Sequence, residues 1–475
     1  MEVETLLKFI TLLVGFYMAW NIGANDVSNA MGTSVGSGAL TLRRAVLIAA
    51  VLEFSGAYFI GGNVSETIQR ELIDVTLFMN DPKTLIYGMC GALLGTGIWL
   101  QLASYFGLPV STTHAIVGAI VGFGVLTIGW AGIQWNMIGS IVLSWILAPV
   151  LSGCVSYFIF GLLQRNILFA LNPTIATKRF IPFLLFIVFT TFSLSLIFNG
   201  LGRLDLSFTL PQAMLVSLSI GGVSWAAGLV VVKRLPTPKT SIKSEERSLP
   251  FTLISLEKAI KHLRRARTGS IDTRNEKITG LLEEMHDLKR DLRKKASFPE
   301  RTSEYNHAEK AFGGMQIISA CFVAFAHGAN DVANAIAPIA AVLDVIKNGV
   351  ISETSSIPSW LLIFGGIGIV IGLATWGWRV IETIGRKITE LTPTRGFCAE
   401  FGAALTILLA SKMGLPISTT HCLVGAVLGV GLARGIRAIN MRTVKDIALS
   451  WIITLPASAV MSILCYYGLR LILDK

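Results

Sequence analysis

Long apolar stretches separated by short polar connections fill most of the chain. Many approach the roughly 20 residues that a helix needs to cross a bilayer. This pattern predicts an all-α polytopic membrane protein with about twelve apolar segments. We expect the first segment to be retained as a membrane span, because it lacks a basic n-region and a small-residue cleavage site. The segments lie at 4–22, 43–62, 84–105, 110–128, 137–162, 181–199, 213–232, 313–327 with a continuation to 343, 359–379, 397–412, 416–433 and 444–471.

Three sequence blocks occur twice at nearly constant spacing. GANDVSNA begins at Gly23 and GANDVANA at Gly328, an offset of 305 residues. GLPVSTTHAIVGAIVGFG begins at Gly107 and GLPISTTHCLVGAVLGVG at Gly414, and LSW recurs at an offset of 306 residues. Such self-similarity at a fixed offset indicates an internal duplication.

The duplication predicts four parts of the chain. Seven apolar segments separate the start of the first copy from the start of the second, and an odd number of crossings would place the copies in opposite orientation. We therefore expect an inverted repeat of about five transmembrane or half-membrane helices per copy, unless a segment such as 110–128 re-enters the membrane. The parts are a first membrane repeat at 1–165, two connecting helices at 166–232, a polar loop at 233–310 and a second membrane repeat at 311–475.

Composition and charge agree with a multi-pass protein of the cell membrane. Hydrophobic residues make up 53% of the chain and charged residues 15%, well below the quarter that is usual in soluble proteins. The net charge is +11, but the loop at 233–310 alone carries 19 Lys and Arg against 12 Asp and Glu. Basic loops normally stay in the cytoplasm, so we expect this loop there and no nucleic-acid partner.

The polar loop has a helical pattern of its own. Leu253, Leu256, Ile260 and Leu263 recur at helical spacing, as do Leu281, Met285, Leu288 and Leu292. Two short amphipathic helices are predicted. They could pack on each other, on a second protomer or on the membrane surface, or the loop could be solvated and partly ordered.

The repeated GAND element places a carboxylate inside each apolar segment. Burying Asp26 or Asp331 costs roughly 2.5 to 3.5 kcal/mol on insertion scales, and neither motif contains Lys or Arg. Gly and Asn are poor helix formers, so we expect the helix to open here and release backbone carbonyls. Carboxylate, carbonyl and amide oxygens form a cation site, for which sodium is our first choice and a proton the alternative. A simple helix–helix contact is the competing interpretation. The amides belong to Asn25, Asn29, Asn330 and Asn334.

The second repeated element places three hydroxyl residues where a helix begins. Pro109 and Pro416 each precede a Ser-Thr-Thr-His run, which is typical of a helix N-cap. Two such helix ends, with free N–H groups and hydroxyl donors, would suit a tetrahedral oxyanion. Ordinary capping is the alternative. The hydroxyl residues are Ser111, Thr112 and Thr113 in the first copy, and Ser418, Thr419 and Thr420 in the second.

Four further ionisable residues are candidates for coupling or proton relay. His114 and His421 follow the hydroxyl triplets, and Glu53 and Glu400 lie in or beside apolar segments. Structural hydrogen bonding is the alternative for each of them. The six cysteines form no CxxC pair or metal-spaced cluster, so we expect no cofactor other than a coupling ion.

Together the two elements predict a paired ion site. A cation at the carboxylates would offset the charge of an anion at the hydroxyls, and each ion would raise the affinity for the other. Ser111, His114 and Asp26 are also the residue types of a hydrolase triad, and an anion channel would need the same anion site. The recurrence of all three hydroxyls in both copies favours transport over either.

These motifs resemble a known family. FAHGANDVANAIAP at 325–338, GANDVSNA at 23–30 and the paired GLP[VI]STTH blocks are similar to the inorganic phosphate transporter family of the Pit type, over roughly 1–165 and 311–471. The resemblance implies an inverted-repeat fold, often dimeric, that is not an enzyme and transports phosphate by alternating access with sodium. Proton-coupled phosphate transport and sulfate transport also occur in the family.

The resemblance also implies roles for particular residues. Phosphate is expected near the two Ser-Thr-Thr triplets with Asn25 and Asn330. Glu53 and Glu400 resemble acidic positions that matter for transport in some members. Sodium is expected at Asp26, Asn29, Asp331 and Asn334.

Overall fold

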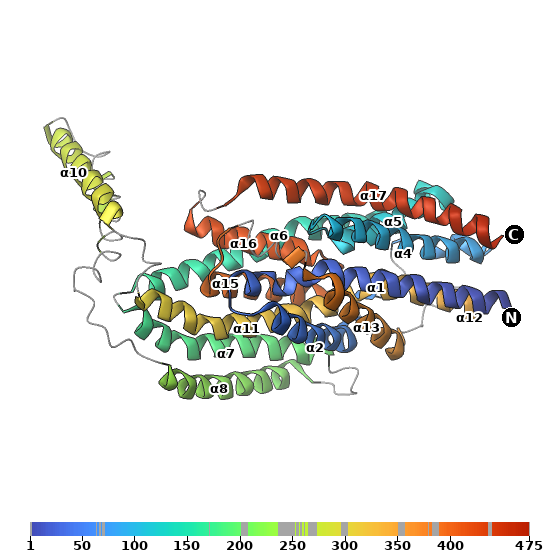
Figure 1. The fold of residues 1–475 in the computed structure, drawn as a ribbon, viewed down its shortest axis with the longest axis horizontal. Helices are drawn as coiled ribbons and strands as arrows, with labels where there is room; N and C mark the ends of the chain where they lie inside the picture. Colours follow the sequence, from blue (N-terminus) through green and yellow to red (C-terminus); the bar gives the residue numbers. More distant parts are fainter. Residues whose placement is uncertain are drawn as a thin grey trace.

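The helices form an elongated body, and both ends of the chain lie at the same end of it (Figure 1). Apart from an isolated bridge between Ile73 and Ile133, the regular structure of the described residues is helical. The computed structural model describes residues 2–62, 64, 65, 68, 72–170, 172–200, 208–235, 273–295, 303–349, 357–378, 380, 381, 389–435 and 439–474, with isolated positions between 252 and 264.

The helices follow the order of the predicted repeat. The first copy holds α1 (Glu2–Gly36), α2 (Leu42–Ile60), η1 (Val75–Phe78), α4 (Pro82–Tyr105), α5 (Thr112–Ile128), η2 (Trp130–Gly132), α6 (Trp135–Leu163) and η3 (Gln164–Leu168). Then come α7 (Pro173–Gly200), α8 (Leu210–Arg234) and α10 (Thr273–Lys295). The second copy holds α11 (Ser303–Asp331), α12 (Ala333–Asn348), α13 (Ser359–Trp376), α15 (Pro393–Lys412), α16 (Thr419–Arg434) and α17 (Met441–Leu473).

Eight of the described helical segments are long and apolar enough to cross a membrane. The first of them begins at Glu4, in α1. Helices α2, α5, α15 and α16, which coincide with four of the expected apolar segments, are not among the eight. These four account for the difference between about twelve apolar segments and eight candidate spans.

In each copy, two helices form a hairpin that enters the body and turns back. Ile128 at the end of α5 lines the same surface cavity as Asp81, the residue that precedes α4. In the second copy, the Arg434 side chain at the end of α16 donates to the Glu390 carbonyl, just before α15. Each hairpin therefore begins and ends at the same side of the body, and α5 and α16 are the returning arms.

The two hairpins pack against long helices of the opposite copy. The α4–α5 hairpin lies on α17, and the α15–α16 hairpin lies on α6. Gly118 in α5 lies against Leu455, and the equivalent Gly425 in α16 lies against Pro149. The first helices of the two copies exchange partners in the same way, because α1 packs on α13 of the second copy and α11 packs on α2 of the first copy.

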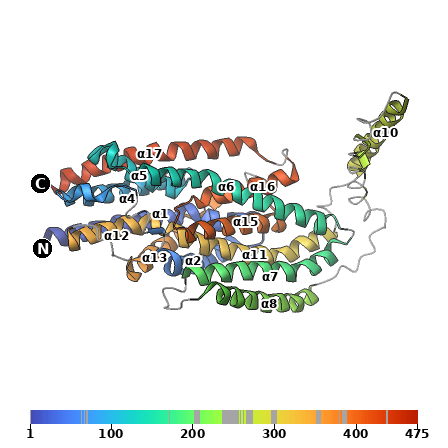
Figure 2. The same cartoon turned by 180° about the vertical axis from the view of Figure 1, so that it is seen from behind.

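The first helices of the two copies run in opposite directions. In Figure 1, α1 starts at the end that holds both chain termini, whereas α11 starts at the other end. The reverse view in Figure 2 gives the same directions. Opposite directions combined with exchanged contacts are the arrangement expected of an inverted repeat.

The predicted helix opening at the first GAND element is wrong. α1 continues without interruption through Gly23 and Asp26. In the second copy only Val332 separates α11 from α12, and its backbone angles are still helical (φ −57°, ψ −31°). The backbone hydrogen bonds of α1 are satisfied within the helix, so the motif supplies side-chain oxygens rather than released carbonyls.

The polar loop contains one of its two predicted helices as a long described element. α10 spans Thr273–Lys295 and includes the pattern at Leu281 to Leu292. The other predicted helix, at 253–263, lies mostly outside the described residues. α10 stands apart from the helical body in both views (Figures 1 and 2).

Candidate functional site

The GAND and Ser-Thr-Thr elements of the two copies meet at one buried site. Asn29 Nδ2, from the first copy, donates to Thr420 Oγ1 of the second copy at 2.8 Å. Asn334 Nδ2, from the second copy, lies 3.1 Å from Thr112 Oγ1 and 3.3 Å from Thr113 Oγ1 of the first. Each amide therefore reaches across to the hydroxyl triplet of the opposite copy, and the site belongs to both.

The tips of the two hairpins also touch each other directly. Thr113 Oγ1 donates to the Ile417 carbonyl at 2.9 Å, and Thr420 Oγ1 donates to the Val110 carbonyl at 3.1 Å. These hydrogen bonds are equivalent under the repeat. They bring the starts of α5 and α16 together in the interior of the body, where all four residues are almost fully buried.

The hydroxyl triplets begin with helix caps, as predicted. Ser111 Oγ accepts a hydrogen bond from the His114 backbone N–H at 3.1 Å, and Ser418 Oγ accepts one from the His421 N–H at the same distance. Capping satisfies only some of the free N–H groups in the first turn of a helix. Two positive helix ends therefore point toward the shared site.

The two aspartates are fully buried but have different partners. Asp331 Oδ2 accepts a hydrogen bond from Thr419 Oγ1 at 2.7 Å. Asp26 Oδ1 accepts one from Asn29 Nδ2 at 3.1 Å. Both aspartates have an exposed fraction of 0%, so any unpaired negative charge on them is costly.

His327 is a site residue that sequence reasoning missed. Its Nε2 lies 2.8 Å from Asp331 Oδ2 and 3.9 Å from Asp26 Oδ2, and its Nδ1 lies 3.3 Å from Glu53 Oε1. The imidazole therefore stands between three carboxylates. His327 immediately precedes the second GAND element, whereas the equivalent residue of the first copy is Ile22. Because the two copies differ at this position, the repeat gives no signal for His327.

Several acceptor oxygens at the site lack a donor. Among the described residues, Asp26 Oδ2, Asn29 Oδ1 and Asn334 Oδ1 are buried without a hydrogen-bond partner. Ligand atoms of Asp26, His327 and Asp331 also lie within 4.8 Å of one another. Unpaired buried oxygens are rare in folded proteins, and oxygen atoms of this kind suit a hard cation.

The first asparagine of each GAND element, Asn25 or Asn330, contacts the neighbouring hairpin. Asn25 Nδ2 donates to Ser104 Oγ at 2.9 Å and to the Leu108 carbonyl at 3.2 Å. The Asn330 amide lies 3.2 Å from Ser411 Oγ, which is the equivalent of Ser104. The predicted contact of Asn25 and Asn330 with phosphate stays a prediction.

Glu400 is surrounded by its own set of donors. It is fully buried on α15 and accepts four side-chain hydrogen bonds from α1 and α11. The donors are Thr33, Ser34, Gln316 and Ser319. None of the four belongs to the motifs, so the structure places Glu400 in a neighbouring polar cluster instead of bringing it to the aspartates.

The two motif histidines pack between tryptophan rings. The His114 ring lies 3.8 Å from the Trp145 ring and 4.3 Å from the His421 ring, and the His421 ring lies 3.6 Å from the Trp451 ring. The first hydroxyl of each triplet bonds to backbone, not to a histidine ring. This geometry is not that of a hydrolase triad, and a relay role for His114 and His421 stays a prediction.

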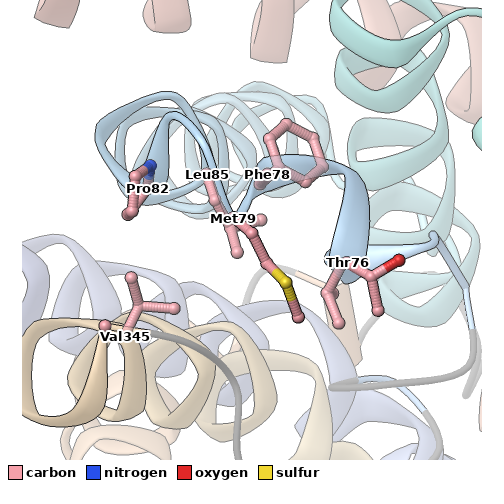
Figure 3. A pocket seen from close by; sticks show the side chains of 8 residues that line it. Thr76, Phe78, Met79, Pro82, Leu85 and Val345 are labelled. Atoms are coloured by element: carbon pink, nitrogen blue, oxygen red, sulfur yellow. The ribbon is translucent and has the colours of Figure 1, made fainter.

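The described surface cavities lie away from these motifs. Figure 3 shows one of about 30 Å³ between η1, the start of α4 and the end of α12, lined by Phe78, Met79 and Leu85 among others. A larger cavity of about 310 Å³ lies beside Arg470. Neither cavity is lined by a GAND or Ser-Thr-Thr residue, so the candidate site is identified by its side chains and not by a surface cavity.

Comparisons with known proteins identify the family of this chain. Residues 22–462 match the model of the phosphate transporter family. The chain is 47% identical to a candidate phosphate permease of Chlamydia pneumoniae over 98% of both chains. It is 43% identical to the chloroplastic inorganic phosphate transporter 2-1 of Arabidopsis thaliana, over 97% of this chain and 71% of that protein.

A solved structure described as the sodium-dependent phosphate transporter has the same fold. Its TM-score is 0.79 at 36% sequence identity, with 98% of this chain and 99% of that chain covered. The repeated motifs, the fold and these relatives agree, and the chain belongs to the phosphate transporter family.

Proposed function

We propose that this protein is a secondary active transporter that carries inorganic phosphate together with sodium by alternating access. One observation carries the proposal: buried acceptor oxygens without a donor lie beside two capped helix starts, in a site built from both halves of the molecule. A site made by both copies changes its access when one copy moves against the other.

Phosphate binds at the starts of α5 and α16. Thr112 and Thr113 form the first turn of α5, and Thr419 and Thr420 form the first turn of α16, with Ser111 and Ser418 at the two caps. Hydroxyl and backbone donors at a helix N-terminus bind an oxyanion without a full positive charge. Asn25 and Asn330 then hold the hairpin tips at the distance that the anion requires.

Sodium binds on the carboxylate side of the same site. Asp26, Asp331 and the side-chain oxygens of Asn29 and Asn334 supply hard ligands, three of which have no donor among the described residues. The sodium dependence of the solved relative agrees with this assignment. Positive ions here offset the charge of phosphate in a low-dielectric interior, so the two substrates favour each other's binding.

Glu53 and Glu400 serve coupling rather than substrate contact. Glu53 touches the aspartates only through His327. Glu400 lies in its own cluster on the side of α11 that precedes the GAND element. The protein works in the cell membrane, with the basic loop at 233–310 in the cytoplasm, where basic loops are retained.

The test is uptake of radiolabelled phosphate into proteoliposomes. An inward sodium gradient should drive accumulation above the outside concentration, and a proton gradient without sodium should not. Sulfate in excess should compete poorly with phosphate. Accumulation driven by protons alone would contradict sodium coupling, whereas accumulation of sulfate in place of phosphate would contradict the substrate.

A further inference from the structure

The six hydroxyls of the two Ser-Thr-Thr triplets are not equivalent, because their hydrogens go to different partners. Thr113 Oγ1 and Thr420 Oγ1 each donate to a backbone carbonyl of the opposite hairpin tip, and a carbonyl oxygen only accepts. Each of these two hydroxyls also accepts from an asparagine amide, that of Asn334 or Asn29. Their hydrogens are therefore used inside the protein and are not available to an anion.

Three other hydroxyls keep their hydrogens free. Ser111 and Ser418 each accept from a backbone N–H at a helix cap, and Thr112 Oγ1 accepts from Asn334 Nδ2 at 3.1 Å. That amide atom is the nitrogen, because it also lies 3.3 Å from Thr113 Oγ1, whose own hydrogen goes to a carbonyl. The three hydroxyls make no hydrogen bond to an acceptor among the described residues, so they can donate to the oxygens of any oxyanion.

Thr419 differs from the other five. Its Oγ1 donates to Asp331 Oδ2 at 2.7 Å, and an ionised carboxylate only accepts. Such a charge-assisted hydrogen bond is roughly twice as strong as a neutral one, so the hydrogen of Thr419 stays on Asp331. No described residue donates to Thr419 Oγ1, although the residue is only 2% exposed. Thr419 therefore presents lone pairs, and no hydrogen, to the site.

The equivalent residue of the first copy, Thr112, has the opposite polarity. Thr112 lies beside Asp26, but Asp26 Oδ2 accepts no hydrogen bond from a described residue. Asp26 Oδ1 accepts from Asn29 and Thr420 instead. With sodium on Asp26, the hydrogen of Thr112 turns toward the anion, because the cation repels it. One half of the site thus offers a donor where the other half offers an acceptor.

We infer that Thr419 selects phosphate over sulfate by accepting a hydrogen bond from a P–OH group of the anion. This inference rests on the proposed function, which places phosphate at the starts of α5 and α16. Near neutral pH phosphate carries a P–OH group, whereas sulfate carries no hydrogen and would bring a lone pair against the lone pairs of Thr419. A site built to pair with a substrate hydrogen rejects an analogue that lacks it, because a buried polar atom is left unpaired.

Sodium explains why this role belongs to Thr419 and not to another acceptor. Asp26 Oδ2, Asn29 Oδ1 and Asn334 Oδ1 also lack donors among the described residues, but they are sodium ligands in the proposed function. A hydroxyl that donates to a carboxylate is also the stronger acceptor, because hydrogen bonds in a chain polarise one another. Thr419 is such a hydroxyl, since its hydrogen is on Asp331.

Competition for phosphate uptake into proteoliposomes at saturating sodium tests the role of Thr419. In the unaltered protein, sulfate and monofluorophosphate, a phosphate dianion without a P–OH group, should both inhibit poorly. Thr419→Val removes the acceptor and should reduce the preference for phosphate over sulfate by about tenfold or more. The preference is the ratio of the sulfate inhibition constant to the phosphate KM. Thr419→Ser retains the acceptor and should keep this ratio.

Thr112→Val is the matched control, because it removes the equivalent hydroxyl of the other copy, which can donate to either anion. It should weaken phosphate and sulfate alike and leave their ratio unchanged. An unchanged ratio in Thr419→Val would overturn the inference. Inhibition of the unaltered protein by monofluorophosphate as strong as by phosphate would also overturn it, and this measurement needs no variant to fold. Absence of sodium-driven phosphate uptake by the unaltered protein would instead overturn the proposed function.

Discussion

Asp26 and Asp331 occupy equivalent positions in the two copies, but their surroundings differ. Asp331 Oδ2 has the Thr419 hydroxyl and the His327 ring within 2.8 Å. Asp26 Oδ2 has no hydrogen-bond partner among the described residues. Asp26 is therefore the carboxylate better placed to accept a cation, and the two half-sites are unequal.

Replacing Asp26 with Asn should weaken activation by sodium. Asn removes the negative charge while keeping the shape of the side chain, so the sodium concentration for half-maximal phosphate uptake should rise by about tenfold or more, or about 1.4 kcal/mol. The measurement is phosphate uptake into proteoliposomes over a range of sodium concentrations.

Asp344→Asn is the control for this substitution. Asp344 is also a buried carboxylate, at 7% exposed, but it lies thirteen residues beyond Asp331, or about 20 Å along a helix. Its loss should leave the sodium dependence unchanged. An unchanged sodium dependence in Asp26→Asn as well would remove Asp26 from the ion site.

The pair formed by His327 and Glu53 has an apolar counterpart in the other half. Gly328 lies against the Glu53 backbone carbonyl, and the equivalent Gly23 lies against the carbonyl of Ile369. Ile22 and Ile369 thus stand where the second half-site has His327 and Glu53. Both isoleucines are fully buried, so this location accepts either an ionisable pair or an apolar pair.

Single and double isoleucine substitutions should reveal the pairing. His327→Ile leaves Glu53 buried without its partner and should destabilise the protein by about 3 kcal/mol. Glu53→Ile should cost less, because His327 keeps Asp331 at 2.8 Å. The double variant should be more stable than His327→Ile, because no unpaired Glu53 remains, yet should not transport phosphate. Thermal unfolding of the purified variants measures this, and a double variant less stable than His327→Ile would refute the pairing.

The helical hairpins depend on glycine where they lie on the long helices. A Cβ atom at Gly429 of α16 would collide with the backbone carbonyl of Gly153 in α6. Because that obstacle is backbone, it cannot turn away as a side chain can. Close packing at these points holds each hairpin tip at the centre of the site.

Gly429→Ala should therefore lower stability by about 1–3 kcal/mol, as overpacking generally does, and should reduce phosphate uptake by displacing the α16 tip. Gly139→Ala, on α6, has no atom within 4 Å of the added Cβ and should be neutral or slightly stabilising. Unfolding temperature and uptake of both variants check the prediction. Equal effects of the two substitutions would mean that the hairpin contact is unimportant.

Some features of these helices could be predicted from the sequence, and others could not. A proline two residues before a Ser-Thr-Thr run is a local signal for a capped helix start, and both caps were found as predicted. The opening of α1 was predicted from weak helix formers in its GAND element, but packing inside the body overrides such propensity. Whether α5 crosses or re-enters depends on its contacts with α17, which apolar length alone does not reveal.

At the scale of the whole molecule, the repeat was the most informative feature of the sequence. Seven crossings were expected between the copies, and the α4–α5 hairpin removes two of them, so the number stays odd and the copies still run oppositely (Figure 1). His327 escaped prediction because it breaks the repeat. Residues that both copies share indicated the candidate site, while those that differ make its two halves unequal.

Simultaneous binding of phosphate and sodium in one site is the central claim for the whole molecule. If both ions occupy the site between the hairpin tips and the aspartates, sodium must raise the affinity for phosphate, and phosphate must raise the affinity for sodium by the same factor.

Calorimetric titration of the purified protein with phosphate, in sodium and in choline at equal ionic strength, tests this claim most directly. We expect the phosphate Kd to be at least about fivefold lower in sodium, and we expect Asp26→Asn to abolish most of that difference. The same phosphate Kd in sodium and in choline would contradict the account.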